Sequence, residues 1–276
     1  MRLYLFFTFF ITFPITAQVW HLPEDTVIFN RFLQYSKQGE QNIIHISDFF
    51  LNTPYAGGTL EGDENERLRV NLRELDCVTF VETVIALHLM LQSDQHTFDN
   101  FCNILQNIRY RDGVIDGYLS RLHYFSEWLD NNRQNGIISL PSISTCRSFN
   151  PDASYMSKHC DRYPALKTNP EACKQMNAIE KNINQLRLCY IPKEQVKDLG
   201  ENIQTGDIIA ITTNIEGLDV THTGFALIRN GKAYLLHASS GAKKVIVSDE
   251  TLHEYLARQR NNTGIIIGRL VNYFCR

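Results

Sequence analysis

The stretch from Thr221 to Ser240 reads THTGFALIRNGKAYLLHASS and carries the clearest local signal of the fold. Two mostly apolar runs flank Asn230-Gly231, the dipeptide that most strongly favours a two-residue hairpin turn. In that register His222 and His237 are diagonal neighbours on adjacent antiparallel strands. Because side chains alternate with period two, both rings then point to one face, roughly 7 to 8 Å apart between backbones. A turn one residue longer would put them on opposite faces.

Further strand-like runs surround this hairpin in the last quarter of the chain, after Gly200. They are apolar, short and separated by turn residues. We expect strands over residues 207–212, 223–228, 233–237, 244–247 and 264–271, with a short helix over 250–258.

The strongest helical segment lies far upstream, over residues 77–91, and is apolar over most of its surface. Such a helix is buried on nearly all sides. Asp76 stands where an N-cap carboxylate accepts the first unpaired backbone N–H groups, so we expect the helix to begin at Cys77. Helical segments first and antiparallel strands later predict an α+β fold.

The remaining chain is less regular. Residues 25–36 and 46–51 are helical or loop material, and Leu119 to Leu129 places apolar side chains at three- and four-residue spacing, as in an amphipathic helix. Residues 131–199 are polar, bear several cysteines and show little periodicity. We interpret them as an elaborating insertion within a single domain.

Cys77 and the two histidines form a plausible catalytic set. A helix N-terminus lowers the pKa of a thiol there, and its N–H groups can stabilise an oxyanion. A histidine oriented by a second polar group is the usual partner of such a nucleophile. Each residue alone is more often structural, as a buried or disulfide-bonded cysteine or a satisfied strand histidine. Their combination favours catalysis.

The chain has seven cysteines, an odd number, so we expect one to stay free if the others form disulfides. The remaining six permit 15 pairings, among which the sequence does not choose. No Cys-x-x-Cys pair occurs, which argues against a structural zinc site. We expect neither a metal nor a cofactor. The six cysteines other than Cys77 are Cys102, Cys146, Cys160, Cys173, Cys189 and Cys275.

The first residues differ from the rest of the chain. Arg2, an apolar run from Leu3 to Phe13 and the small residue Ala17 predict a signal peptide over residues 1–17 and a mature domain over 18–276. We therefore expect an exported protein, periplasmic or secreted. No later apolar stretch is long enough for a membrane anchor. A net charge of −3 without a basic stripe argues against nucleic acid as a partner.

Taken together, these motifs resemble the NlpC/p60 superfamily of papain-like peptidoglycan hydrolases. The resemblance implies a helix bearing the nucleophile packed on an antiparallel sheet, with Cys77 as nucleophile, His222 as base and His237 as the orienting residue. It also places Tyr55 beside the nucleophile, as part of an oxyanion hole. The motifs that carry it are Pro54-Tyr55-x-Gly57-Gly58, Asp76-Cys77, Gly206-Asp207, His222-Thr223-Gly224 and Leu236-His237-Ala238-Ser239-Ser240.

Two departures narrow the resemblance. The residues after Cys77 are not the usual Ser-Gly, and the stretch between Cys77 and His222 is long. Together with the segment SRLHYF at 120–125, they resemble the N-acetylmuramoyl-L-alanine amidase-like branch, which cuts between the lactyl group of muramic acid and L-alanine. From this resemblance we expect Arg121, His123 and Tyr124 to line the pocket. A guanidinium suits a peptide carboxylate and an aromatic ring suits a sugar face, although a solvated helix start is the ordinary alternative.

Three other functions stay open at this stage. The first is a γ-D-glutamyl-diamino acid endopeptidase acting on the stem peptide. The second is a catalytically inactive wall-binding module, and the third is an acyltransferase that shares the fold. The expected partner in the first two is a peptidoglycan fragment, or muropeptide. The oligomeric state is not indicated.

Overall fold

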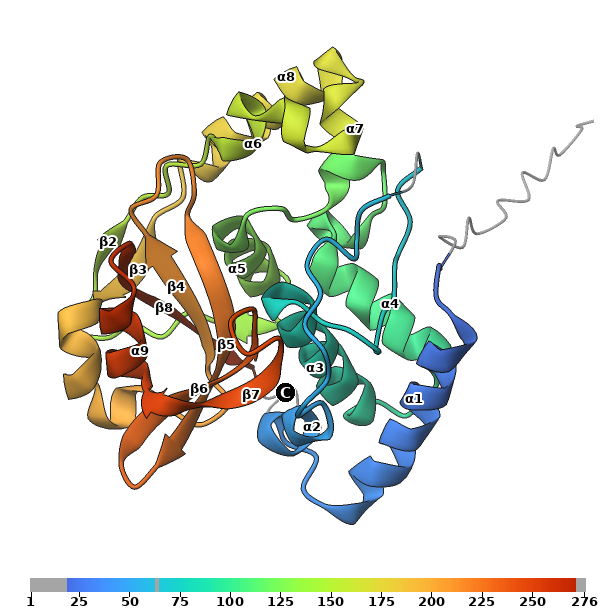
Figure 1. Cartoon of the computed structure of the whole chain (residues 1–276), viewed down its shortest axis with the longest axis vertical. Coiled ribbons are helices and arrows are strands. Elements are labelled where there is room, and N and C mark those ends of the chain that lie inside the picture. The colour runs from blue at the N-terminus through green and yellow to red at the C-terminus, as the bar shows by residue number, and fades with distance from the viewer. Residues whose placement is uncertain (1–18, 63–64, 272–276) are drawn as a thin grey trace, which may run out of the picture.

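A computed structural model describes residues 19–62 and 65–271 of the chain, and the predicted signal peptide lies outside them. The fold is built on one antiparallel sheet with the strand order β2-β3-β8-β4-β5-β6-β7, to which β1 adds by pairing with β8 (Figure 1). The strands are β1 (Ile138–Ser139), β2 (Arg147–Phe149), β3 (Leu188–Pro192), β4 (Ile208–Thr213), β5 (Val220–Arg229), β6 (Lys232–Ser239), β7 (Lys244–Thr251) and β8 (Asn262–Leu270).

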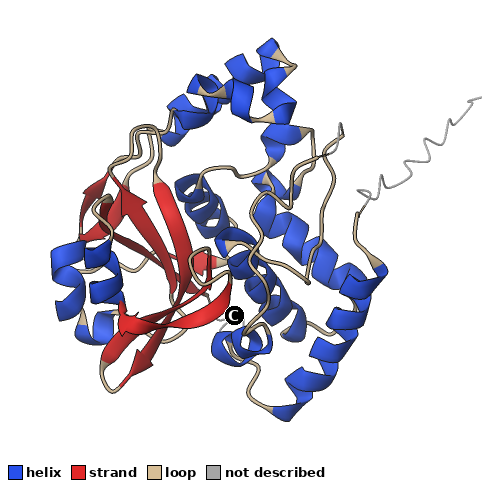
Figure 2. Cartoon of the chain, viewed as in Figure 1, coloured by secondary structure: helices blue, strands red, loops and turns tan. Residues whose placement is uncertain are grey.

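Helices cover both faces of this sheet (Figure 2). The α-helices are α1 (Pro23–Tyr35), α2 (Ile43–Phe49), α3 (Cys77–Leu91), α4 (Phe98–Arg109), α5 (Phe125–Gln134), α6 (Tyr155–Lys158), α7 (Pro164–Lys167), α8 (Pro170–Ile183) and α9 (Leu252–Arg258). Short 3₁₀ helices are η1 (Ser36–Gln38), η2 (Arg111–Gly113), η3 (Tyr118–Ser120), η4 (Cys160–Arg162), η5 (Lys193–Asp198) and η6 (Gly200–Asn202). Among the described residues, no helix is long and apolar enough to cross a bilayer.

The main core lies between the sheet and the N-terminal helices. The apolar side chains of α3 pack against β5 and β6, where Phe80 meets Phe225 with ring centroids 5.8 Å apart. A second core lies on the opposite face, where Leu252 and Leu256 of α9 pack with Ala226 and other sheet residues. Burying one stripe of each helix against the sheet is the usual way in which an α+β domain removes apolar surface from water.

The predicted start of the central helix is confirmed. Helix α3 runs from Cys77 to Leu91, and the Asp76 carboxylate accepts the N–H of Thr79 at 2.8 Å. Glu82 is almost fully buried within this helix. Its carboxylate is neutralised by Arg109 of α4, with Nε and Oε2 2.7 Å apart, so it is a structural ion pair that ties the two helices together.

The hairpin prediction is also confirmed. Arg229 pairs with Lys232 and Phe225 with Leu236, which is the register required by a two-residue Asn230-Gly231 turn. Both turn residues have positive φ, as this turn type requires.

Other expectations need correction. The helix expected over residues 119–129 begins only at Phe125, because η3 and an extended segment precede it. The insertion expected over 131–199 is more ordered than its sequence suggests: it contains α8, and its last strand, β3, pairs with β8 in the main sheet. Helix α4, at 98–109, was not predicted.

The disulfides lie within this insertion. Cys146 pairs with Cys189 and Cys160 with Cys173, while Cys77 and Cys102 are free. The expectation of a single free cysteine is therefore wrong. Cys102 is buried in the main core, where no other cysteine of the described residues reaches it.

Candidate active site

A cavity of about 210 Å³ opens at the N-terminus of α3. It is bounded by the start of α3, the start of β5 and the segment between η3 and α5. Cys77, His222 and Thr223 line one part of it, and His123 and Tyr124 line another. The structure thus brings together residues that are 145 positions apart in sequence, from Cys77 to His222.

Cys77 is the first residue of α3 and is half-buried. Burial raises the pKa of its thiol to about 12, and the neighbouring Asp76 carboxylate adds to the rise. Backbone N–H groups of Thr223, Val78 and Cys77 itself act in the opposite direction. The N–H groups at the helix start thus lower the pKa of the thiol, as expected, but in the free protein the loss of hydration outweighs them. The resting side chain is a neutral thiol.

His222 and His237 lie on one face of the sheet, as the hairpin register predicts. Nε2 of His222 and Nδ1 of His237 are 2.5 Å apart, and the rings are nearly perpendicular. Gly224, opposite His237, makes this possible, since a Cβ there would lie 2.8 Å from the Cβ of His237. Because Nε2 of His222 is engaged with His237, Nδ1 is the ring nitrogen of His222 that can form a hydrogen bond with another group.

Burial keeps both imidazoles neutral. It lowers the pKa of His222 to about 4 and that of His237 to about 3, the latter also through the nearby His222. A neutral imidazole is the form that can accept a proton, so at neutral pH the cavity holds a thiol and a competent base.

This burial predicts acid sensitivity of the fold. The unfolded imidazoles titrate near pH 6.5. Because the pKa values of His222 and His237 are lower in the folded state, the unfolded state binds more protons below that pH, and the free energy of unfolding falls from about pH 6.5 toward pH 4. We expect the His237→Gln variant to lose less stability between pH 7.5 and 5 than the wild type, as measured by urea unfolding.

The comparison between the two proteins is the readout, because buried carboxyl groups act in the opposite direction. Glu66 and Glu82 have raised pKa values, mainly through burial, and they bind protons more readily in the folded state. They affect the wild type and the variant alike. Equal losses of stability in both proteins would contradict the assignment of a buried, neutral His237.

Tyr55 lies beside the nucleophile position. Its backbone bridges Leu75, just before the N-cap residue of α3. Burial raises the pKa of Tyr55 to about 12, and the nearby Cys77 and Asp76 add to the rise. Its hydroxyl therefore stays protonated and can donate a hydrogen bond near the thiol.

The segment SRLHYF is placed only partly as expected. His123 and Tyr124 line the cavity, but their polar atoms are engaged within the protein: Nε2 of His123 lies 2.9 Å from the Tyr118 carbonyl, and the Tyr124 hydroxyl donates to Glu180. Arg121 is buried, and its guanidinium pairs with Glu61 at 2.6 Å. The structure thus directs Arg121 toward an acidic side chain of the protein, whereas the sequence suggested a substrate carboxylate.

Sequence reasoning missed two residues at this site. Tyr255 of α9 packs against both histidines, with ring centroids 6.1 Å from His222 and 5.4 Å from His237. Asp219 lines the cavity, but its carboxylate accepts the N–H groups of Ser126 and Val220. The sequence pattern of a strand or helix does not indicate either contact, because both depend on how elements far apart in the sequence pack together.

A metal site would need several histidine, cysteine or carboxylate side chains close together. Within 19–62 and 65–271, no group of three or more histidine, cysteine, aspartate or glutamate side chains is arranged to hold a metal ion.

The fold and the cavity define an enzyme-like α+β protein, and comparison with known proteins identifies its family. Residues 45–265 match the N-acetylmuramoyl-L-alanine amidase-like family. The chain belongs to this family, which supports a peptidoglycan amidase-like function. Among curated proteins, none matches the sequence.

Several solved structures are similar. An N-acetylmuramoyl-L-alanine amidase from Bacteroides uniformis shares 39% identity at a TM-score of 0.80, over 85% of this chain and 100% of that one. A Bacteroides fragilis protein named as a candidate xylanase shares 42% identity at a TM-score of 0.78, over 82% and 99%. A Legionella pneumophila protein, at 22% identity and a TM-score of 0.68 over 90% and 95%, shows the same fold.

Proposed function

We propose that the protein is a cysteine amidase that cuts the amide bond between the lactyl group of muramic acid and L-alanine in muropeptides. The observation that carries the proposal is the shared cavity of Cys77 and His222, with His237 bonded behind His222, in a chain of the amidase-like family. These are the groups that nucleophilic acyl transfer requires.

The reaction begins from neutral partners. As the Cys77 sulfur attacks the lactyl carbonyl carbon, Nδ1 of His222 takes the thiol proton. His237 stabilises the resulting imidazolium through its contact with Nε2. His222 then gives the proton to the departing amine of L-alanine, and a thioester remains on Cys77. Water, deprotonated by His222, hydrolyses the thioester and restores the thiol.

The oxyanion of each tetrahedral intermediate needs hydrogen-bond donors. The backbone N–H of Cys77 and the protonated hydroxyl of Tyr55 supply them in this proposal. Donors fixed in place before the reaction stabilise the developing charge without a cost of reorganisation, which is why a rigid helix start is a favourable position for the nucleophile.

The assignment to the NlpC/p60 superfamily and its papain-like fold is part of the same proposal. It rests on the motif order, and a buried helix that carries the cysteine against an antiparallel sheet agrees with it. Export through a signal peptide over residues 1–17, into a periplasm or beyond, is likewise proposed from the sequence. The exported protein would encounter its peptidoglycan substrate in that compartment.

The carboxylates of the cavity do not favour a glycosidase. Glycoside hydrolysis usually employs two carboxyl groups that flank the scissile bond. Here Glu61 is paired with Arg121, and Asp219 is buried with its oxygens bonded to backbone N–H groups. Three other functions are compatible with the fold: an endopeptidase, an acyltransferase and an inactive wall-binding module. The products formed from a defined substrate distinguish them from the amidase.

The product test uses the mature protein with a disaccharide-tetrapeptide and, separately, with the free tetrapeptide. We expect the first to be split into disaccharide and intact tetrapeptide and the second to remain uncut, because an amidase pocket must hold the sugar on the acyl side. Mass spectrometry identifies the products. Cleavage of the free tetrapeptide between D-glutamate and the diamino acid would instead show an endopeptidase.

A further inference from the structure

Tyr255 contacts both histidines of the candidate active site. Its ring centroid lies 5.4 Å from that of His237, with the two planes at 83°, and 6.1 Å from that of His222, with the planes at 26°. Tyr255 belongs to α9, which packs beside β6 and β7 (Figure 1). Leu252 and Leu256 fix this helix in the second core, so the ring has a defined place next to the histidines.

The role of His222 as a base determines where the two imidazoles carry their protons. A neutral imidazole has one N–H, and its other ring nitrogen accepts. For Nδ1 of His222 to take a proton from Cys77, the proton of the resting ring must lie on Nε2, which then donates to Nδ1 of His237. Nδ1 of His237 is an acceptor in this arrangement, so the proton of His237 also lies on Nε2.

The opposite arrangement of protons would disable the base. If Nδ1 of His237 donated to Nε2 of His222, the proton of His222 would lie on Nδ1, and that nitrogen would have no lone pair for the thiol of Cys77. Nε2 of His237 is buried and meets no hydrogen-bond partner within the described part of the chain. What surrounds this one atom therefore decides which arrangement is favoured, because a buried N–H without an acceptor is costly.

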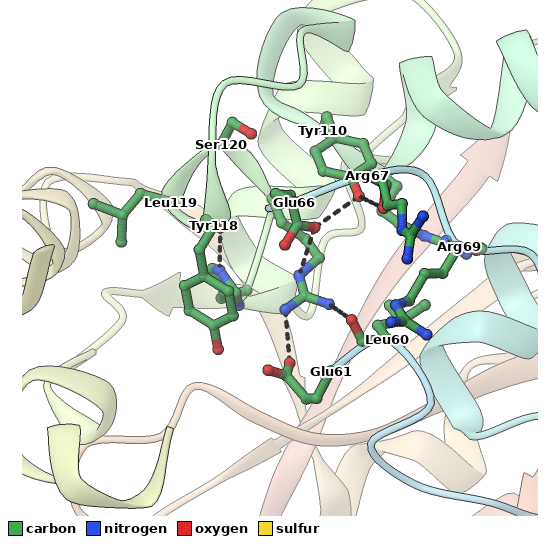
Figure 3. A network of polar contacts seen from close by, with 12 residues as sticks. Leu60, Glu61, Glu66, Arg67, Arg69, Tyr110, Tyr118, Leu119 and Ser120 are labelled. Carbon is green, nitrogen blue, oxygen red and sulfur yellow. Dashed lines mark hydrogen bonds and ion pairs between the residues drawn. The ribbon is translucent and has the colours of Figure 1, made fainter. Parts of the chain in front are cut away.

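The carboxylates near the cavity are engaged elsewhere. Glu61 is bonded to the Arg121 guanidinium at 2.6 Å, and Glu66 lies 3.6 Å from Nε of the same arginine, as Figure 3 shows. The carboxylate of Asp219 accepts the N–H of Ser126 at 2.7 Å. These side chains are thus held by other donors and do not serve as acceptors for the second histidine.

The aromatic ring of Tyr255 can interact with Nε2 of His237 in place of a carboxylate. The edge-to-face packing of the two rings is the arrangement in which an N–H at one ring edge meets the π electrons of the other ring. The face of an aromatic ring is negative, so it attracts an N–H and repels the lone pair of an unprotonated nitrogen. It also attracts the positive charge that the histidine pair acquires when His222 takes a proton.

We propose that Tyr255 is a positioning residue for the histidine pair: its ring accepts the Nε2–H of His237, favours this tautomer and so leaves Nδ1 of His222 free to act as the base. The proposal rests on the proposed function and deepens it. Tyr255 acts through His237 and does not touch the reacting atoms, so the ring is required and the hydroxyl is not.

The tautomers are measured directly by nitrogen NMR at neutral pH, on protein isotopically labelled in its histidines, because protonated and unprotonated ring nitrogens have well-separated shifts. The signals of His222 and His237 are assigned by their loss in the His222→Ala and His237→Ala variants. In the wild type we expect both rings to carry the proton on Nε2. In Tyr255→Leu, which keeps an apolar side chain but removes the π face, the signals should shift toward protonation at Nδ1.

Turnover of the disaccharide-tetrapeptide gives a second readout. Tyr255→Phe retains the ring and should keep kcat within about twofold of the wild type. Tyr255→Leu should lower kcat about tenfold with little change in KM, because the state of the base affects the transition state and not substrate binding. Tyr190→Leu is the matched control: it removes a half-buried tyrosine that packs on Phe149 of β2, and it should change neither the tautomers nor kcat.

Three results would overturn the proposal. They are a wild-type His237 that carries its proton on Nδ1, unchanged tautomers in Tyr255→Leu, and equal losses of kcat in Tyr255→Phe and Tyr255→Leu. The first needs no variant, so it decides the matter even if Tyr255→Leu does not fold. The NMR readout is also independent of turnover: tautomers that depend on Tyr255, in a protein that leaves muropeptides uncut, would support the positioning role and refute the amidase activity.

Discussion

Replacing Cys77 by alanine is expected to lower hydrolysis of a disaccharide-tetrapeptide by roughly 10⁴-fold or more, because no other group of the cavity can form the thioester. The fold should persist. Cys77 is only the first residue of α3, its backbone N–H remains, and the cap between Asp76 and Thr79 does not involve its side chain. The measurement is product formation by mass spectrometry, with circular dichroism to verify the helix content.

Cys102→Ala is the matched control. Cys102 is the other free cysteine of the described residues, and it lies in the main core on α4, away from the cavity. Its replacement should cost some stability but leave the turnover of the folded protein near that of the wild type. Activity that survives in Cys77→Ala but disappears in Cys102→Ala would reverse the assignment.

The second large effect concerns the two histidines. His222→Ala should reduce kcat/KM by roughly 10² to 10⁴-fold, the usual contribution of a positioned base. His237→Ala should cost less, because the base remains and only its support is lost. His237→Gln should recover part of that loss, since its amide can still form a hydrogen bond with Nε2 of His222. His96→Ala, in a loop after α3, serves as control.

The pH profile separates a base from a merely structural residue. Burial lowers the pKa of His222 to about 4, so kcat/KM should stay level at neutral pH and fall as the pH approaches 4, where the imidazole becomes protonated. In His237→Ala the ring nitrogen that stabilises the protonated form of His222 is removed, so the pKa of His222 drops further and this fall should move to lower pH. An identical profile in both proteins would show that His237 does not act on the base.

Local sequence determined the hairpin and the start of α3. Asn230-Gly231 specifies a two-residue turn because both residues tolerate positive φ. The turn sets the register of β5 and β6, and the register determines which residues of the two strands lie opposite one another. The same holds for Asp76, whose carboxylate caps α3 within one turn. The relation between His222 and His237, 15 residues apart, was therefore predictable in full.

Tertiary structure decided what surrounds these groups. Whether a thiol at a helix start has a low or a high pKa depends on how much water the packed elements remove, and here burial wins over the N–H groups of α3. Arg121 is a further case: the side chain suggested a substrate carboxylate, but the chain fold brings Glu61, 60 residues upstream, into contact with it. Hydration and long-range pairing are properties of the assembled molecule, so a local pattern cannot encode them.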